Sequence, residues 1–281
     1  MPNGTNGGVR GKETKVGQKT FVSRPTRFIR QSSSLLAKNM KYKALLFDLD
    51  DTLWATFDNN KASLHRLYDE EEWGAYYATF EDYFAVYFPH QEQLWDDYRK
   101  GYISKDQLLL DRLRYPLRGL VSWSDPQVME LNQRFINYVQ QQTALIPHAL
   151  EVLAELHRSY TIVIVSNGFE ETQYGKINGS GLAPYIDKVV LVDHVGVPKP
   201  APEFLDYALK AVGCSRQEAL VIGDSWPSDI LCALNSGIDS VWYNLWQVPM
   251  PTYDQQRHSV IEIRDLRELL PLLTPSTAPR L

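Results

Sequence analysis

Residues 43–54 read KALLFDLDDTLW, an apolar run that passes directly into three acids within four positions. The apolar part has the composition of a buried parallel strand, which we predict over 43–49. Because side chains alternate across a strand, Asp48 and Asp50 can face a common space at its end while Leu49 packs away from it. Crowded acids repel unless a cation or a proton separates them, so the segment indicates an oxygen-ligand site for Mg²⁺. A helix N-cap cluster is the alternative that this segment alone leaves open.

The alternation of strand and helix signals continues towards the end of the chain. Short apolar runs rich in β-branched residues predict four further strands, at 161–166, 188–192, 219–223 and 240–244. Patterns with helical spacing follow or separate them, at 148–159, 170–178, 201–212, 228–235 and 264–273. Such alternation is typical of βαβ units, so we expect an α/β fold with a doubly wound parallel sheet.

One interval breaks this rhythm, because residues 52–147 contain no strand candidate. Their spacing predicts helices at 61–71, 72–88, 91–100, 104–113 and 125–142, with Pro89 inside an otherwise helical pattern. We therefore expect an all-helical insert at 54–146, between the first and second strands. Open α/β sheets bind ligands at the carboxyl ends of their strands, so the insert lies beside the expected site.

The later predicted strands are followed by groups that suit an anionic ligand. The second ends in Ser166 and Asn167, whose hydroxyl and amide can hold phosphate oxygens. After the third comes Lys199, held between two prolines that stiffen the segment. The fourth ends before Asp224, and Asp229 follows near the start of a helix, where it can complete a metal site or favour the helix dipole. Each group alone also suits an ordinary turn or surface position.

Composition and charge exclude several classes of function. The chain has 281 residues, 44% of them hydrophobic, and its formal net charge of −5 argues against binding a nucleic-acid polymer. No apolar stretch is long enough to span a membrane. Cys214 and Cys232 cannot build a disulfide framework, so a cytoplasmic location is expected. Nothing in the sequence indicates an obligatory protein partner.

The first 39 residues differ in composition from the rest of the chain. They hold eight basic residues and one acid and show no apolar periodicity, so we predict a disordered basic tail at 1–39. The tail suits an anion-seeking or transit-like arm, or a dispensable extension before a true start at Met40. A core domain is then expected at 40–53 and 147–275, with a C-terminal tail at 276–281.

The order of these segments resembles the haloacid dehalogenase superfamily of hydrolases, over about residues 42–273. DLDDT at 48–52 matches the first motif, and Ser166, Lys199 and the pair Gly223-Asp224 with Asp229 match the later ones. The helical insert looks like the type 1 cap of that superfamily. The resemblance implies a Rossmann-like core with strand order 5-4-1-2-3.

The resemblance also implies a mechanism and a role for each motif residue. Asp48 would attack phosphorus to form an aspartyl phosphate, while Asp50 protonates the leaving alkoxide and later deprotonates water. Mg²⁺ would be held by Asp48, the backbone carbonyl of Asp50 and Asp224, and Lys199 would share in neutralising charge. An acid at position 50 favours phosphoryl transfer over dehalogenation, because a halide departs without a proton. Other motif residues would orient phosphoryl oxygens or support the acids: Thr52, Ser166, Asn167 and Asp229.

A closer resemblance narrows the substrate class. FDLDDTLW at 47–54, LWDDY at 94–98 followed by GYIS at 101–104, and SNGF at 166–169 are similar to segments of bacterial pyrimidine 5′-nucleotidases. This implies a small phosphomonoester substrate, a nucleoside 5′-monophosphate such as dUMP, UMP or TMP. Aromatic side chains of the insert can stack on a base. We expect the candidates for substrate selection to be Trp54, Phe57 and Trp95.

Alternatives from other classes remain open. The protein could be a phosphatase or a mutase for a small sugar phosphate, depending on how the insert admits water. A phospho-acceptor regulatory domain also uses an early acid cluster with a Lys, and a long-lived aspartyl phosphate would identify it. An inactive interaction protein could retain the fold, although the intact set of Asp48, Asp50, Lys199 and Asp224 argues against this.

Overall fold

A parallel β-sheet forms the centre of the molecule. The computed structural model describes residues 42–255 and 259–274, so the predicted tails at 1–39 and 276–281 lie outside the described residues, as does Met40. Within the described ranges one six-stranded sheet has the order β3-β2-β1-β4-β5-β6. Its strands are β1 (Ala44–Phe47), β2 (Thr161–Ser166), β3 (Lys188–Leu191), β4 (Ala219–Gly223), β5 (Asp239–Tyr243) and β6 (Val260–Ile263).

The order 5-4-1-2-3 expected for the first five strands is confirmed, and a sixth strand extends the sheet beyond it. β6 pairs in parallel with β5, with Val260 opposite Ser240, and it was not predicted. Four residues, of which only Val260 and Ile263 are buried, give too short a pattern to stand out from the surrounding loop. The helix predicted from residue 264 begins later, as the 3₁₀ turn η6 (Leu266–Glu268) followed by α11 (Leu269–Leu273).

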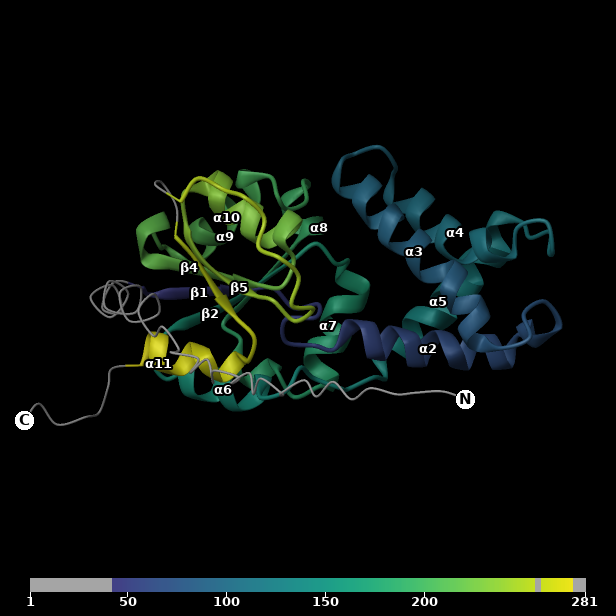
Figure 1. The fold of residues 1–281 in the computed structure, drawn as a ribbon, viewed down its shortest axis with the longest axis horizontal. Helices are drawn as coiled ribbons and strands as arrows, with labels where there is room; N and C mark the ends of the chain where they lie inside the picture. Colours follow the sequence, from purple (N-terminus) through teal and green to yellow (C-terminus); the bar gives the residue numbers. More distant parts are fainter. Residues whose placement is uncertain (1–41, 256–258, 275–281) are drawn as a thin grey trace, which may run out of the picture.

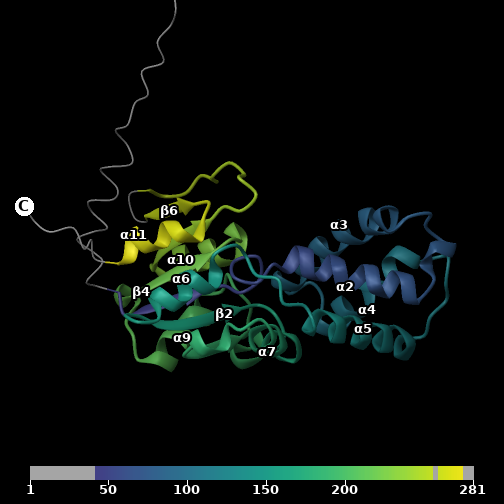
Figure 2. The same cartoon turned by 90° about the horizontal axis from the view of Figure 1, so that it is seen from below.

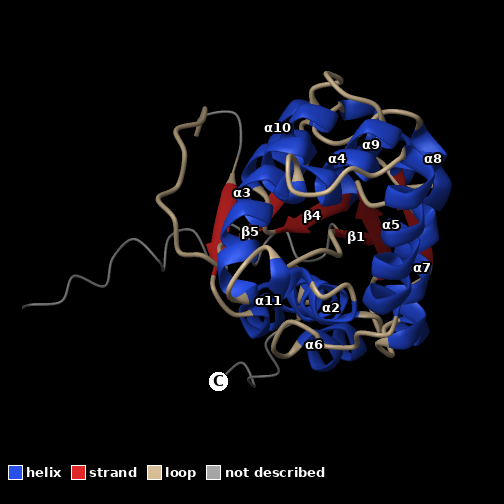
Figure 3. Cartoon of the chain, turned by 90° about the vertical axis from the view of Figure 1, so that its right-hand side faces the viewer, coloured by secondary structure: helices blue, strands red, loops and turns tan. Residues whose placement is uncertain are grey.

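Helices cover both faces of the sheet (Figures 1 and 3). Leu45 and Phe47 of β1 belong to the hydrophobic core on one face, and Ala44 and Leu46 to the core on the other, as alternation across a strand requires. The first face carries α6 (Ala149–Leu156), α7 (Glu170–Gly179) and α11. The second carries α9 (Pro202–Val212) and α10 (Leu231–Ser236). The remaining short turns are α8 (Val192–Val195), η3 (Ala183–Tyr185), η4 (Arg216–Glu218) and the π-helical turn η5 (Trp226–Ile230).

The all-helical insert lies between β1 and β2 and stands to one side of the sheet (Figure 2). Its elements are α2 (Thr56–Glu70), η1 (Trp73–Ala75), α3 (Phe80–Arg99), α4 (Lys105–Arg114), η2 (Tyr115–Leu117) and α5 (Asp125–Gln140). We call residues 56–140 the cap. Two chain segments join it to the core, and they are hydrogen bonded to each other from Ile146 N to Leu53 O (2.9 Å) and from Ala55 N to Ala144 O (3.1 Å). Within residues 42–255 and 259–274, no helix combines the length and the apolarity needed to cross a membrane.

The cap differs from prediction around Pro89. Two helices were expected at 72–88 and 91–100, whereas α3 runs through Pro89 without interruption and begins only at Phe80. Tyr83 and Tyr87 before the proline and Leu94 after it are buried on the same side of α3. This shared packing outweighs the one backbone hydrogen bond that proline cannot donate.

Candidate active site

The acids of the first motif lie at the carboxyl end of β1, in the middle of the sheet. Phe47 pairs with Ile164 of β2 and with Ile222 of β4, so the next residue, Asp48, lies between the ends of both neighbouring strands. Its backbone N–H continues the ladder to Ile222 O at 2.9 Å. A cavity of about 250 Å³ opens here, and it is lined by residues of both the core and the cap.

Lys199 is buried against the nucleophile candidate. Its Nζ donates to Asp48 Oδ1 (2.8 Å), to Asp229 Oδ1 (2.6 Å) and to Val165 O (2.6 Å), and only 1% of the side chain is exposed. Burial lowers the pKa of this ammonium, but the carboxylates of Asp229 and Asp48 together raise it above its ordinary value. The Lys199 side chain is therefore a fixed positive charge beside Asp48.

Asn167 places the Lys199 backbone rather than reaching freely into the cavity. Its Oδ1 accepts from Lys199 N (2.7 Å), and its Nδ2 donates to Lys199 O (3.0 Å) and to Ser228 Oγ (3.2 Å). The predicted pair Ser166 and Asn167 does line the cavity, together with Lys199. The amide groups of Asn167 that were expected to hold phosphate are thus occupied by protein partners.

Three carboxylates gather beside the Lys199 ammonium. Asp48, Asp224 and Asp229 each offer an oxygen, and these oxygens lie within 4.8 Å of one another. Burial and the neighbouring Asp229 raise the pKa of Asp48 to about 8, and burial with Asp48 raises that of Asp224. One ammonium cannot balance three carboxylates, so the donor set and its charge fit a hard divalent cation such as Mg²⁺.

Asp224 and Asp229 are held differently. Thr52 Oγ1 donates to Asp224 Oδ1 (3.1 Å) and accepts from Asp224 N (3.0 Å), while Trp242 Nε1 donates to Asp224 O (2.7 Å). Asp229 Oδ2 accepts from Ser225 N (3.0 Å), so both oxygens of Asp229 already have protein partners. Thr52 is fully buried and does not line the cavity, which corrects the expected phosphate contact of its hydroxyl.

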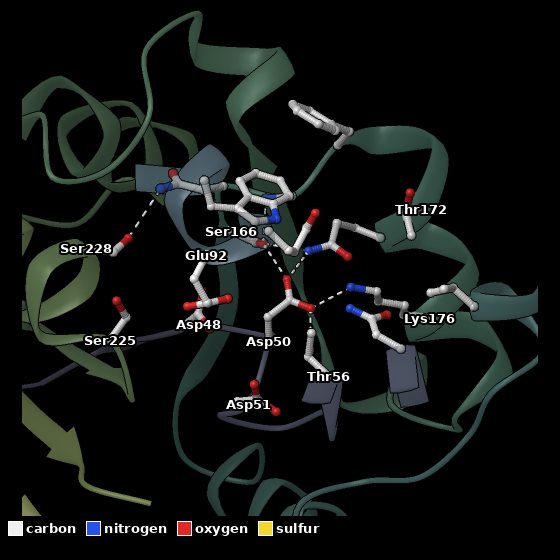
Figure 4. A pocket seen from close by; sticks show the side chains of 18 of the residues that line it. Asp48, Asp50, Asp51, Thr56, Glu92, Ser166, Thr172, Lys176, Ser225 and Ser228 are labelled. Atoms are coloured by element: carbon white, nitrogen blue, oxygen red, sulfur yellow. Dashed lines mark hydrogen bonds and ion pairs between the residues drawn. The ribbon is translucent and has the colours of Figure 1, made fainter. Parts of the chain in front are cut away.

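Asp50 turns away from Asp48 and towards α7 (Figure 4). Its carboxylate accepts from Lys176 Nζ (2.5 Å), Gln173 Nε2 (2.6 Å) and Thr56 Oγ1 (2.6 Å), with Ser166 Oγ at 3.4 Å. Burial alone would raise the pKa of Asp50, but the charge and hydrogen bond of Lys176 outweigh it and the pKa is lowered. Asp50 is therefore an ionised carboxylate in this arrangement.

The order of these groups along the chain matches a known family. Residues 45–243 fit the family model of haloacid dehalogenase-like hydrolases. The chain belongs to this family. Its relatives include pyrimidine 5′-nucleotidase YjjG of Escherichia coli strain K12, 32% identical over 82% of this chain and 99% of the relative. Pyrimidine 5′-nucleotidase PynA of Streptococcus pneumoniae is also 32% identical, over 82% of this chain and 96% of its own length.

A solved structure agrees with the fold of this hydrolase. The putative HAD-hydrolase YfnB of Bacillus subtilis, described as bound to magnesium and showing interdomain movement, superposes with a TM-score of 0.73. It is 27% identical, and the match covers 83% of this chain and 99% of that one. The L-2-haloacid dehalogenase of Xanthobacter autotrophicus, 20% identical with a TM-score of 0.61 over 84% of this chain and all of its own, shares the fold.

Three residues of this hydrolase that contact Asp50 were not predicted from the sequence: Thr56, Gln173 and Lys176. Gln173 and Lys176 are buried, and they lie three residues apart on α7, so they share one side of the helix. The sequence predicts a helix at 170–178 and no site residue on it. The sequence does contain a signal for Gln173 and Lys176. Where a core helix carries Gln and Lys in place of apolar residues on its buried side, a polar partner is indicated.

Of the three aromatic candidates, one lines the cavity. Trp95 does so, and its ring stacks on Phe169 with the centroids 5.4 Å apart. Trp54 is fully buried with the Lys176 ammonium 4.5 Å from its ring centroid, and Phe57 makes an edge contact with Trp246. Neither Trp54 nor Phe57 is among the residues that line the cavity, and their role in substrate selection stays a prediction.

Proposed function

We propose that this hydrolase is a Mg²⁺-dependent phosphomonoesterase that acts on pyrimidine nucleoside 5′-monophosphates. The observation that carries the proposal is the buried Asp48 carboxylate, in contact with the Lys199 ammonium and within 4.8 Å of carboxylate oxygens of Asp224 and Asp229. The substrate class is supported by the two pyrimidine 5′-nucleotidases among the relatives. Those names describe the relatives. That this chain has the same activity is the hypothesis to be tested.

In the first half of the reaction, Asp48 is the nucleophile. A carboxylate oxygen of Asp48 forms a bond to phosphorus as the bond from phosphorus to the 5′-oxygen breaks. Asp50 gives its proton to that oxygen, so the nucleoside leaves as a neutral alcohol. Lys199 remains protonated throughout and reduces the repulsion between the nucleophile and the phosphate.

In the second half, water cleaves the aspartyl phosphate. Asp50, now ionised, accepts a proton from water as the water oxygen bonds to phosphorus, and the Asp48 carboxylate is released together with inorganic phosphate. Mg²⁺ bound by Asp48 and Asp224 would offset negative charge on the phosphoryl group. The Thr52 hydroxyl orients Asp224, and Asn167 orients Lys199, so both act as positioning residues.

The protonation of Asp50 has to change when substrate enters. The Lys176 ammonium keeps this carboxylate ionised, whereas a proton donor must be neutral. An anionic phosphoryl group next to Asp50 favours the uncharged form, because like charges raise the pKa of a carboxyl. Substrate binding itself therefore prepares Asp50 as the acid.

The test is phosphate release by the full chain from a panel of phosphomonoesters in the presence of Mg²⁺. We expect release from UMP, dUMP and TMP, and loss of release in Asp48→Asn, with the circular-dichroism spectrum unchanged. Glyceraldehyde 3-phosphate and phosphoserine belong in the panel, because phosphatases for both occur among the relatives at 27–28% identity. Clear residual turnover by Asp48→Asn would contradict the nucleophile assignment. A wild-type phosphoprotein that lasts for minutes would instead favour a regulatory domain.

A further inference from the structure

The cavity extends from the acids into the cap, where apolar side chains form part of its wall. On the cap side it is lined by apolar residues of α4 and α5, namely Leu109, Phe135, Ile136 and Val139, and by residues of α2 and α3 that are mostly polar or charged, including Asn60, Glu92, Trp95 and Arg99. Among them are two polar side chains that are more than nine-tenths buried, Gln91 and Arg112. Sites for organic ligands combine apolar surface with placed polar groups, and here the ligand is the part of the substrate that carries the phosphate.

Arg112 has a donor without an acceptor. Its Nε donates to Asn132 Oδ1 at 2.6 Å, and its guanidinium carbon lies 5.0 Å from the centroid of the Phe135 ring. Its Nη2 is buried and has no hydrogen-bond partner among the described residues. A guanidinium can only donate, and a buried donor left unpaired is costly, so the position calls for a ligand oxygen that accepts.

Gln91 supplies the matching acceptor. Its Oε1 is also buried and has no hydrogen-bond partner among the described residues. It lies on α3, and α3 packs beside α4, which carries Arg112. Gln91 and Arg112 both line this cavity, and each carries a buried polar atom without a partner among the described residues.

We propose that Arg112 and Gln91 bind the imide edge of uracil or thymine, an inference that rests on the proposed nucleotidase function. Arg112 Nη2 donates to a ring carbonyl oxygen, and Gln91 Oε1 accepts from the N3–H group beside it. Cytosine carries an unprotonated nitrogen at that position, which would face the Gln91 oxygen with two lone pairs opposed.

The test compares three substrates in each variant: UMP, CMP and p-nitrophenyl phosphate, which has no imide. In the wild type we expect kcat/KM for UMP to exceed that for CMP. In Gln91→Met we expect kcat/KM for UMP to fall by roughly 10-fold to 100-fold, the range for leaving a buried polar group unpaired, with p-nitrophenyl phosphate unchanged. Gln93→Met is the matched control, since Gln93 is exposed on the same helix and bonds to Asp97.

Arg112→Met is the second variant, and its p-nitrophenyl phosphate activity reports whether the cap still folds. A selective loss of UMP activity in either variant, with a smaller ratio of UMP to CMP, supports the inference. Equal losses on all three substrates would show a structural role and overturn it. Wild-type activity on CMP equal to that on UMP would also overturn it while leaving the nucleotidase function intact. Release from p-nitrophenyl phosphate but from no nucleotide would refute the proposed function itself.

Discussion

Asp48 and Asp50 lie two residues apart, yet their surroundings shift their pKa values in opposite directions. Burial and Asp229 raise the pKa of Asp48 to about 8, whereas Lys176 overcomes the effect of burial and lowers the pKa of Asp50. The proposed roles need the reverse, an ionised nucleophile and a protonated acid. A bound cation lowers the pKa of Asp48, and an anionic phosphoryl group raises that of Asp50. In the proposed mechanism, cation and substrate together would therefore bring both carboxyl groups to the required form.

Removing Lys176 tests the pKa shift of Asp50 separately from that of Asp48. We predict that Lys176→Met lowers kcat by roughly 10-fold to 100-fold, part of the roughly 10²-fold to 10⁴-fold that positioned acid–base catalysis supplies. Without the Lys176 ammonium, burial keeps Asp50 protonated, so it cannot accept the proton from water in the second half of the reaction. KM should change little, since Lys176 contacts Asp50 rather than the Asp48 side of the site. Steady-state kinetics with UMP measure the two constants separately.

Lys176→Arg is the control for this prediction. It keeps a cation on the same side of α7, so it should retain most of the kcat that Lys176→Met loses. If both variants lose kcat equally, packing beneath Trp54 rather than charge on Asp50 would explain the effect, because the ammonium also lies 4.5 Å from that ring.

At the scale of elements, the strands of the core could be predicted and several details of their partners could not. β2 and β4 match their predicted limits because continuous apolar runs bounded by turn residues leave little choice of register. The continuity of α3 through Pro89 depends on packing that the local pattern does not contain. β6 depends in the same way on pairing with β5.

The residues of the candidate site also fall into two groups, those that the local sequence indicates and those that depend on packing. Locating the strands is enough to find most of the acids and Ser166, because Asp48, Asp50 and Asp224 come just after strands and Ser166 ends β2. Lys199 comes later, after β3 and the turn α8. Cap residues and residues on the buried sides of helices depend on how helices turn relative to the sheet. For this reason the sequence could indicate that Asp48 and Asp224 lie together, whereas it could not show that Trp95 lines the cavity and that Trp54 and Phe57 do not.

Within the cap, α2 and α5 are joined by a group of charges centred on Glu70. Arg66 and Arg134 each place a nitrogen 2.8 Å from its carboxylate, and the Tyr138 hydroxyl also donates to it. The hydrogen bonds of Tyr138, Arg66 and Arg134, in that order, lower the pKa of Glu70 to about 2. An acid with a lowered folded-state pKa stabilises the fold above its unfolded value of about 4.3, and this stabilisation is lost as the pH falls towards 2.

We predict that Glu70→Gln lowers the melting temperature at neutral pH and reduces its fall between about pH 4.5 and pH 2, because the variant has no carboxylate to protonate there. Thermal melts at half-unit intervals of pH measure both effects. Glu81→Gln, at an exposed acid in the first turn of α3, should follow the wild-type curve. Parallel curves for wild type and Glu70→Gln would contradict the prediction.

In the whole molecule, α7 connects the cap to the acid of the site. Its Lys176 and Gln173 hold Asp50, while its first turn contacts the cap through an ion pair of Glu171 with Lys105, 2.8 Å long. The stacked pair of Trp95 and Phe169 adds a second contact immediately before the helix begins. Substrate bound between core and cap would therefore lie beside α7, the helix that contacts both the cap and Asp50. Residues that select the substrate in the cap are then close to the residues that carry the reaction in the core.

The crowded acids lead to a prediction about the stability of the entire core. We predict that Mg²⁺ at about 100 times its Kd raises the stability of the protein by about 2.7 kcal/mol over a sample in EDTA, or roughly 5–10 °C in melting temperature. The reason is that Asp48, Asp224 and Asp229 face one another with a single ammonium among them. Sodium at equal ionic strength should not reproduce the shift, and Asp224→Asn should remove most of it. Asp206→Asn, which breaks an exposed pair with Arg216, should keep it. Identical melting temperatures in Mg²⁺ and EDTA would show that the carboxylates are balanced by protons instead, and the proposed metal-dependent chemistry would fail with them.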